Sequence, residues 1–93
     1  AVDNARQEDV RAIARLRLAT VLMDDGAYDE AMKMVEAKPA EGFDALFASM
    51  RGDILLAQKK RSEARTAYKA AVEKTTDAAF RDTLRLKLDA LGE

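Results

Sequence analysis

The stretch from Ala45 to Val72, ALFASMRGDILLAQKKRSEARTAYKAAV, has the pattern of two helices folded back on each other. Each half places apolar side chains at three- and four-residue steps, which puts them on one face of a helix. The polar run from Gln58 to Ser62 separates the halves. Ser62 is expected to cap the second helix, because its hydroxyl can accept a hydrogen bond from a free backbone N–H. The stretch therefore predicts a helical hairpin.

The same hairpin pattern occurs earlier in the chain. Shifted by 33 residues, Ala12 to Val35, AIARLRLATVLMDDGAYDEAMKMV, aligns without a gap with Ala45 to Tyr68. A period near 33 residues made of helix, turn and helix is typical of helical-repeat proteins, in which each hairpin packs against the next. The paired small or apolar residues are Ala12 with Ala45, Ile13 with Leu46, Ala19 with Gly52, Val21 with Ile54, Leu22 with Leu55, Met23 with Leu56, Ala31 with Ala64, and Val35 with Tyr68.

These pairs are the residues through which the chain resembles a tetratricopeptide repeat. That pattern has a small residue at its eighth position, an alanine at its twentieth and an apolar or aromatic residue four positions later. The matching residues are Ala19 and Gly52, Ala31 and Ala64, then Val35 and Tyr68. The resemblance implies that alanine and glycine lie where two helices cross most closely, since a larger side chain would overpack the contact.

We predict an all-α fold of five helices, arranged as two helix-turn-helix hairpins followed by a capping helix. The first helix is expected to be capped by Asp3 or Asn4 and to end near Asp24. Its buried side is expected to hold Val10, Ile13, Ala14, Leu18, Val21 and Leu22. The second helix is expected from Tyr28 to Pro39, the third from Glu41 to Gln58, the fourth from Ser62 to Thr75, and the amphipathic fifth from a cap at Thr76-Asp77 to Gly92.

Residues 1–93 are expected to form a single domain. Repeat 1 covers about 12–38, repeat 2 about 45–75, and the capping helix about 77–91. The chain starts at Ala1 without a methionine and enters a helix within a few residues, so we expect it to be a fragment of a longer protein.

Composition limits the possible functions. Sixteen Lys and Arg residues against seventeen Asp and Glu give a net charge of −1, which disfavours nucleic acid as a partner because phosphate binding needs an excess of positive charge. The chain contains no cysteine, and its apolar runs are shorter than the roughly 18–20 residues that span a bilayer. We therefore expect no direct membrane insertion by these residues.

The sequence offers no catalytic, cofactor-binding or metal-binding site. Without histidine and cysteine, the commonest general base, metal ligand and thiol nucleophile are absent. Asp24, Asp25, Asp29 and Glu30 lie close together but lack the spacing of a calcium-binding EF-hand loop, and solvated helix ends explain them better. We therefore expect no enzyme activity and no cofactor.

The resemblance to tetratricopeptide repeats does imply a binding surface, because the first helix of each hairpin lines a concave groove in such repeats. The alternative is that these residues are core, since apolar stripes at helical spacing are usually buried. The expected groove would accept an extended or helical segment of another protein. Its residues would be Ile13, Leu16, Thr20, Met23, Leu46, Ser49, Asp53, Leu56, Asp82, Leu86 and Asp89.

A narrower resemblance covers most of the chain. The run from Ala14 to Ala19, Phe43 with Ala45-Leu46, Arg51 to Ala57, Ala64-Arg65 with Ala67-Tyr68, and Leu86 to Asp89 before Leu91 are similar to the C-terminal part of the YfgM family, ancillary subunits of the bacterial SecYEG translocon. This resemblance implies a domain on the periplasmic side of the inner membrane, held there by an N-terminal transmembrane helix. It also implies that the partners are the translocon, periplasmic chaperones and newly exported chains.

Two functions are consistent with these patterns. The first is an accessory, chaperone-like protein-binding module at the export translocon. The second is a structural or regulatory adaptor whose repeats mediate self-association or hold a signalling partner. The oligomeric state stays open, because an unpaired terminal helix can pack within its own chain or against another.

Overall fold

The computed structural model describes residues 2–92, with their side chains from residue 6 onward. Within these residues the fold is all-α, as predicted from the sequence, and contains no strand. The helices are α1 (Val2–Asp24), α2 (Tyr28–Glu36), α3 (Asp44–Ala57), α4 (Arg61–Lys74) and α5 (Ala78–Leu91). None of them combines the length and the apolar character needed to cross a bilayer.

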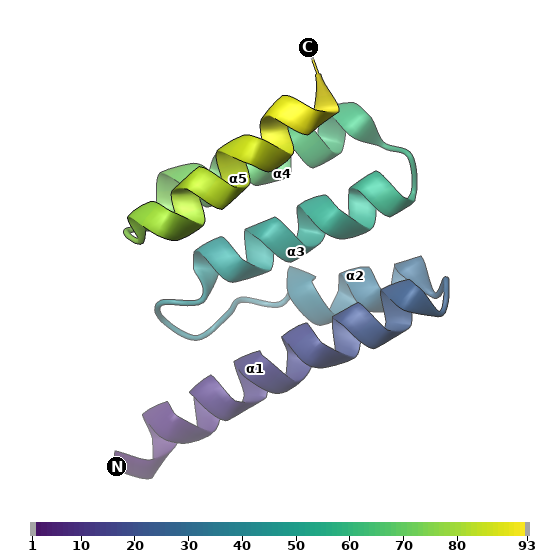
Figure 1. Cartoon of the computed structure of the whole chain (residues 1–93). Coiled ribbons are helices and arrows are strands. Elements are labelled where there is room, and N and C mark those ends of the chain that lie inside the picture. The colour runs from purple at the N-terminus through teal and green to yellow at the C-terminus, as the bar shows by residue number, and fades with distance from the viewer. Residues whose placement is uncertain (1, 93) are drawn as a thin grey trace.

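The helices form two layers (Figure 1). Helices α1, α3 and α5 run in the same direction in the front layer, and the return helices α2 and α4 lie behind them. Each return helix packs with the helices before and after it, so buried side chains of α1, α2 and α3 form one cluster and those of α3, α4 and α5 form a second. The result is a flat array measuring 46 × 31 × 16 Å.

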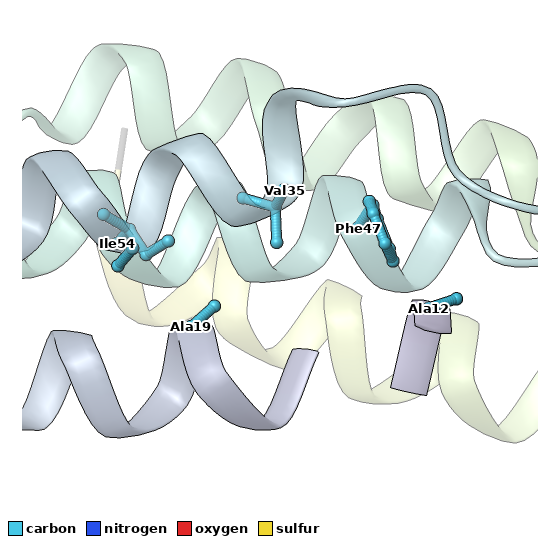
Figure 2. Close-up of a cluster of buried hydrophobic side chains, with 6 residues drawn as sticks. Ala12, Ala19, Val35, Phe47 and Ile54 are labelled. Atoms are coloured by element: carbon cyan, nitrogen blue, oxygen red, sulfur yellow. The ribbon is translucent and has the colours of Figure 1, made fainter. Parts of the chain in front are cut away.

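Small residues lie where the helices of each hairpin cross, as the repeat pattern implies. Ala19 of α1 and Ala31 of α2 are fully buried, and so is Ala64 of α4. In Figure 2, Ala12 and Ala19 point from α1 toward Val35 of α2 and toward Phe47 and Ile54 of α3. In the second hairpin, the position equivalent to Ala19 is Gly52, which has no side chain and lies against the large ring of Tyr68.

The two hairpin turns have the same backbone hydrogen bonds. After α1, Gly26 N–H donates to Met23 C=O (3.0 Å) and Ala27 N–H donates to Leu22 C=O (2.8 Å). Thirty-three residues later, Lys59 N–H donates to Leu56 C=O (2.9 Å) and Lys60 N–H to Leu55 C=O (2.8 Å). Both turns are Schellman motifs, which need a left-handed residue after the helix. Gly26 has φ +82° and Lys59 has φ +66°, so a lysine adopts in the second turn the conformation that glycine adopts in the first.

Helix α5 is fastened at both ends. Asp77 caps its start, as expected, by accepting hydrogen bonds from the backbone N–H groups of Ala79 (2.9 Å) and Phe80 (3.2 Å). At the other end, the guanidinium groups of Arg61 and Arg65 on α4 donate to the carbonyl oxygens of Leu91 and Gly92. Cations favour the C-terminus of a helix because its last carbonyl groups are unpaired and partly negative.

Three expectations about helix ends were wrong. Ser62 does not cap α4, because the turn at Lys59 makes Lys60 the residue before the helix, and no side chain caps it. Helix α2 ends at Glu36 rather than Pro39. Helix α3 begins at Asp44 rather than Glu41, because Gly42 has φ +92° and a turn places Phe43 N–H on Ala40 C=O (3.0 Å).

The start and the buried side of α1 also differ from expectation. The backbone of α1 is helical from Val2, ahead of Asp3 and Asn4, whose side chains lie outside the described part. Of the six residues expected on its buried side, only Leu22 packs against the core, and the other five are exposed. The buried face is instead formed by Ala12, Leu16, Ala19 and Met23 together with Leu22.

Candidate functional site

The exposed side of the front helix layer contains a hollow of about 210 Å³ between α1, α3 and the start of α5. Five residues of the expected groove line it: Leu16, Thr20, Leu46, Ser49 and Asp53. Arg17, Met50 and Phe80 also line it, and sequence patterns had not placed them there. Residues from three helices that are far apart in the sequence therefore share one concave surface.

A second hollow, of about 300 Å³, continues along α3 on the other side of Asp53. Asp53 and Leu56 are the expected groove residues in its lining. Its remaining lining comes from α4 and α5, namely Arg61, Tyr68, Lys87, Ala90 and Leu91. We refer to the two hollows, which meet at Asp53, together with the exposed side chains beside them, as the concave groove.

The other expected groove residues lie outside both hollows. Ile13 is exposed on α1, and Asp82, Leu86 and Asp89 are exposed on α5. Met23 is only partly exposed, because it packs against the buried cluster shared by α1, α2 and α3. Met23 therefore contributes to packing inside the first hairpin. The two hollows share Asp53, so the groove surface is continuous along α3.

Asp53 at the centre of the groove is not a free negative charge. The Lys87 ammonium donates to Asp53 Oδ1 at 3.1 Å and lies 3.5 Å from Oδ2. The Tyr68 hydroxyl also donates to Oδ1, and Lys87 Nζ lies 5.5 Å from the centre of the Tyr68 ring. Burial raises the pKa of Tyr68 above its ordinary value, and the hydrogen bond to Asp53 and the negative charge of Asp53 raise it further. The three side chains connect α3, α4 and α5 under the groove.

The groove is mainly apolar. Leu46 and Leu56 in the hollows are each 40% exposed. Ile13 is 41% exposed and Leu86 is 69% exposed outside the hollows, at the repeat positions equivalent to Leu46 and Asp53. Exposed apolar side chains that gather on one surface are typical of protein–protein interaction sites. An apolar floor with compensated charges can bind another polypeptide by burying this surface.

Chemistry that breaks or makes bonds has few candidate groups here. The chain contains neither histidine nor cysteine. Within the described residues, Asp and Glu side chains do not gather in groups of three or more that could hold a metal ion.

A larger hollow of about 660 Å³ lies where α1 extends past the shorter α2, and sequence patterns had given no sign of it. Ala12, Phe47, Pro39 and Ala40 form its apolar lining, and its charged lining consists of Glu8, Arg11, Arg15, Lys38, Glu41 and Asp44. Three basic and three acidic groups compensate one another, so this hollow has no preference for a ligand of one charge.

Comparison with known proteins agrees with the helical-repeat fold. A family model described as a tetratricopeptide repeat-like domain matches residues 1–93. The chain is similar to an ancillary SecYEG translocon subunit from Neisseria gonorrhoeae, with 33% identity over 91 residues, which is 97% of this chain and 44% of that protein. It is also similar to an ancillary SecYEG translocon subunit from Escherichia coli K12, with 31% identity over 85 residues, which is 91% of this chain and 41% of that protein.

The chain thus spans less than half the length of these curated relatives. No solved structure gives a significant match. The resemblance to translocon ancillary subunits that the sequence indicated is confirmed by these two relatives. The family match over the whole chain, together with the two stacked hairpins, leads to one conclusion: this chain belongs to the tetratricopeptide repeat-like domain family.

Proposed function

We propose that this domain is a non-catalytic accessory module of the SecYEG protein-export translocon, and that its concave groove binds a polypeptide segment there. The observation that carries the proposal is the exposure of Ile13, Leu46, Leu56 and Leu86 on one face of a domain similar to ancillary translocon subunits. The bound polypeptide would be a translocon subunit, a chaperone or a chain in the course of export.

The groove suits a short segment rather than a large partner surface. Its two hollows lie end to end along α3, and their volumes of about 210 and 300 Å³ are sufficient for a few side chains. An extended strand or one helical face places apolar side chains at regular intervals, which matches apolar positions spread over α1, α3 and α5. Phe80 and Met50 add an aromatic and a flexible apolar group that can adapt to different segments.

We place the domain on the periplasmic side of the inner membrane. This location is what the resemblance to ancillary subunits of the SecYEG translocon implies. A newly exported chain emerges unfolded and exposes apolar side chains there, so an open apolar groove would be useful to a chaperone-like subunit.

The proposal is tested by substituting groove leucines in the full-length natural protein and measuring its recovery with affinity-purified translocon from solubilised membranes. Leu46→Asp and Leu86→Asp alter exposed side chains and leave the buried clusters intact. Thr66→Asp introduces the same charge on the exposed side of α4 and serves as the control. Burying one leucine contributes about 1.5–3 kcal/mol, so each groove variant is expected to bind about ten- to a hundredfold more weakly.

Circular dichroism of each variant establishes that the fold is retained. Recovery of both groove variants at the level of Thr66→Asp would show that the groove does not hold the translocon or a translocon-bound chain. Loss of recovery in all three variants would point instead to the overall charge of the domain.

A further inference from the structure

A second group of exposed apolar side chains lies on α1, away from the groove. Val10 is 58% exposed, Leu18 is 46% exposed and Val21 is 55% exposed, and Ala14 between them is also exposed. These residues follow one another at steps of four, four and three, so they form one stripe along the helix. We call this stripe the outer face of α1.

The internal repeat shows how the equivalent residues of the later helices pack. Thirty-three residues later, the positions of Val10, Ala14, Leu18 and Val21 are occupied by Phe43, Phe47, Arg51 and Ile54. Phe47 and Ile54 of α3 lie near Val35 of α2 (Figure 2). They are buried in the cluster that also contains Ala31, and Phe43 packs against that cluster. The Arg51 guanidinium donates to the carbonyl oxygen of Val35 at 2.8 Å. In α3, the residues equivalent to the outer face of α1 therefore form the surface by which this helix docks on the preceding hairpin.

Helix α5 repeats the arrangement. The positions of Phe47, Arg51 and Ile54 become Phe80, Leu84 and Lys87 after another shift of 33 residues. Leu84 is fully buried in the cluster with Tyr68 and Ala64 of α4, and Phe80 packs against that cluster. Lys87 reaches Asp53 and the Tyr68 ring of the preceding hairpin. Two of the three front helices thus use the same stripe to dock on the hairpin before them.

We propose that the outer face of α1 docks a further helical hairpin of the same repeat type, located N-terminal to α1 in the same polypeptide. The occupant would present a helix with small and β-branched side chains, as α2 does with Ala31 and Val35. In both observed cases the docked hairpin directly precedes the docking helix in the sequence. Relatives more than twice as long as the matched stretch leave room for such a hairpin in proteins of this kind.

A second copy of this chain is a poorer occupant. A copy stacked head to tail would offer α5 to α1, and α5 has Arg85 at the position where α1 has Ala19 and α3 has Gly52. A close helix crossing needs a small residue at that position, and Arg85 would be buried without a partner of opposite charge. The polar end of the array at α5 and the apolar end at α1 therefore do not match.

The test is the reactivity of a single thiol in the full-length natural protein, purified without its partners. Val21→Cys probes the outer face, and Thr66→Cys on α4 provides an exposed reference. Alkylation by a maleimide is followed at the level of the modified peptide, and rates are divided by those of the denatured protein. We expect Val21→Cys to react at least about tenfold more slowly than Thr66→Cys, since a covered position reacts only during local opening. The ratio should not change on dilution.

A benzophenone attached to Val21→Cys should crosslink within the chain, to residues N-terminal to α1. Equal alkylation of the two positions would overturn the proposal, because the outer face would be open to solvent. Protection that disappears on dilution, or crosslinks between two chains, would assign the face to a second copy and would also overturn it. None of these outcomes depends on what the concave groove binds.

Discussion

The backbone of Gly52 in α3 lies directly against the ring of Tyr68 in α4. A Cβ atom at Gly52 would be 2.6 Å from Tyr68 Cε1 and 2.7 Å from Cδ1, closer than a side chain can approach. In the first hairpin the same two positions are Ala19 and Val35, so a smaller side chain in one helix accompanies a larger one in the other. The pair sets how closely α3 and α4 approach.

Gly52→Ala is therefore expected to destabilise the fold even though alanine favours helix formation. Overpacking costs about 1–3 kcal/mol, against a gain of about 1 kcal/mol in helix propensity. Chemical denaturation should show a net loss of up to about 2 kcal/mol. In a Tyr68→Leu background the same substitution should cost less than about 0.5 kcal/mol, because the ring is gone. An equal loss in both backgrounds would show that the ring is not the cause.

The raised pKa of Tyr68 predicts a loss of stability in alkaline solution. The unfolded chain releases the tyrosine proton near pH 10, whereas burial and Asp53 hold the proton in the folded state to higher pH. The stabilisation is therefore fully present below about pH 10 and declines as the pH rises above it, by at most about 1.4 kcal/mol per pH unit.

Urea unfolding of the natural sequence and of Tyr68→Phe between about pH 9 and pH 11 checks this dependence. At neutral pH the variant should be about 1 kcal/mol less stable, because it loses the hydrogen bond to Asp53. Above pH 10 the difference between the two proteins should shrink. A difference that stays constant with pH would contradict the assigned protonation.

The two hairpin turns predict that introducing a glycine in one and removing the glycine of the other change the stability in opposite directions. Lys59 occupies the left-handed conformation that disfavours side chains, so Lys59→Gly should raise the free energy of unfolding by about 0.5–1 kcal/mol. Gly26→Ala should lower it by about 1 kcal/mol through backbone strain alone, since a Cβ there would meet no atom within 4 Å. Thermal unfolding of both variants measures the two effects, and changes of the same sign would be inconsistent with the shared turn geometry.

The cap of α5 is open to a simple test. Asp77→Ala removes the acceptor of two backbone N–H groups and should cost about 0.5–2 kcal/mol, whereas Asp77→Asn keeps an acceptor oxygen and should stay near the natural stability. Hydrogen exchange at Ala79 and Phe80 reports the same loss locally. Unchanged exchange in Asp77→Ala would show that the cap contributes little.

The repeat register predicted the positions that pack inside a hairpin. Ala19, Ala31 and Ala64 are fully buried, and Tyr68 is almost so, because a close helix crossing imposes the same size limit in every repeat. The register did not show which helix covers a stripe. Val10 and Val21 have the spacing of core residues but are 58% and 55% exposed, because no helix among the described residues covers them.

The groove was predictable only in part, for a related reason. Leu16 and Thr20 of α1 line the first hollow at positions that the register indicated, whereas Ile13 and Met23 lie outside both hollows. Tyr68 and Lys87 enter the second hollow through contacts between helices. One signal was present in the sequence: Lys87 occupies the register position of the buried Ile54, and a charged side chain at a docking position needs a partner of opposite charge. Likewise, Ser62 failed as a cap because the length of the preceding turn, rather than cap propensity, set where α4 begins.

The most direct test of the central claim is photo-crosslinking from the groove in native membranes. A photoreactive amino acid at Leu46 lies in the groove lining, and the same group at Thr66 lies on the exposed side of α4. We predict that Leu46 yields adducts with a translocon subunit, a chaperone or an exported chain, and that Thr66 does not. Identical adducts from both positions, or adducts from Thr66 alone, would contradict a polypeptide-binding groove.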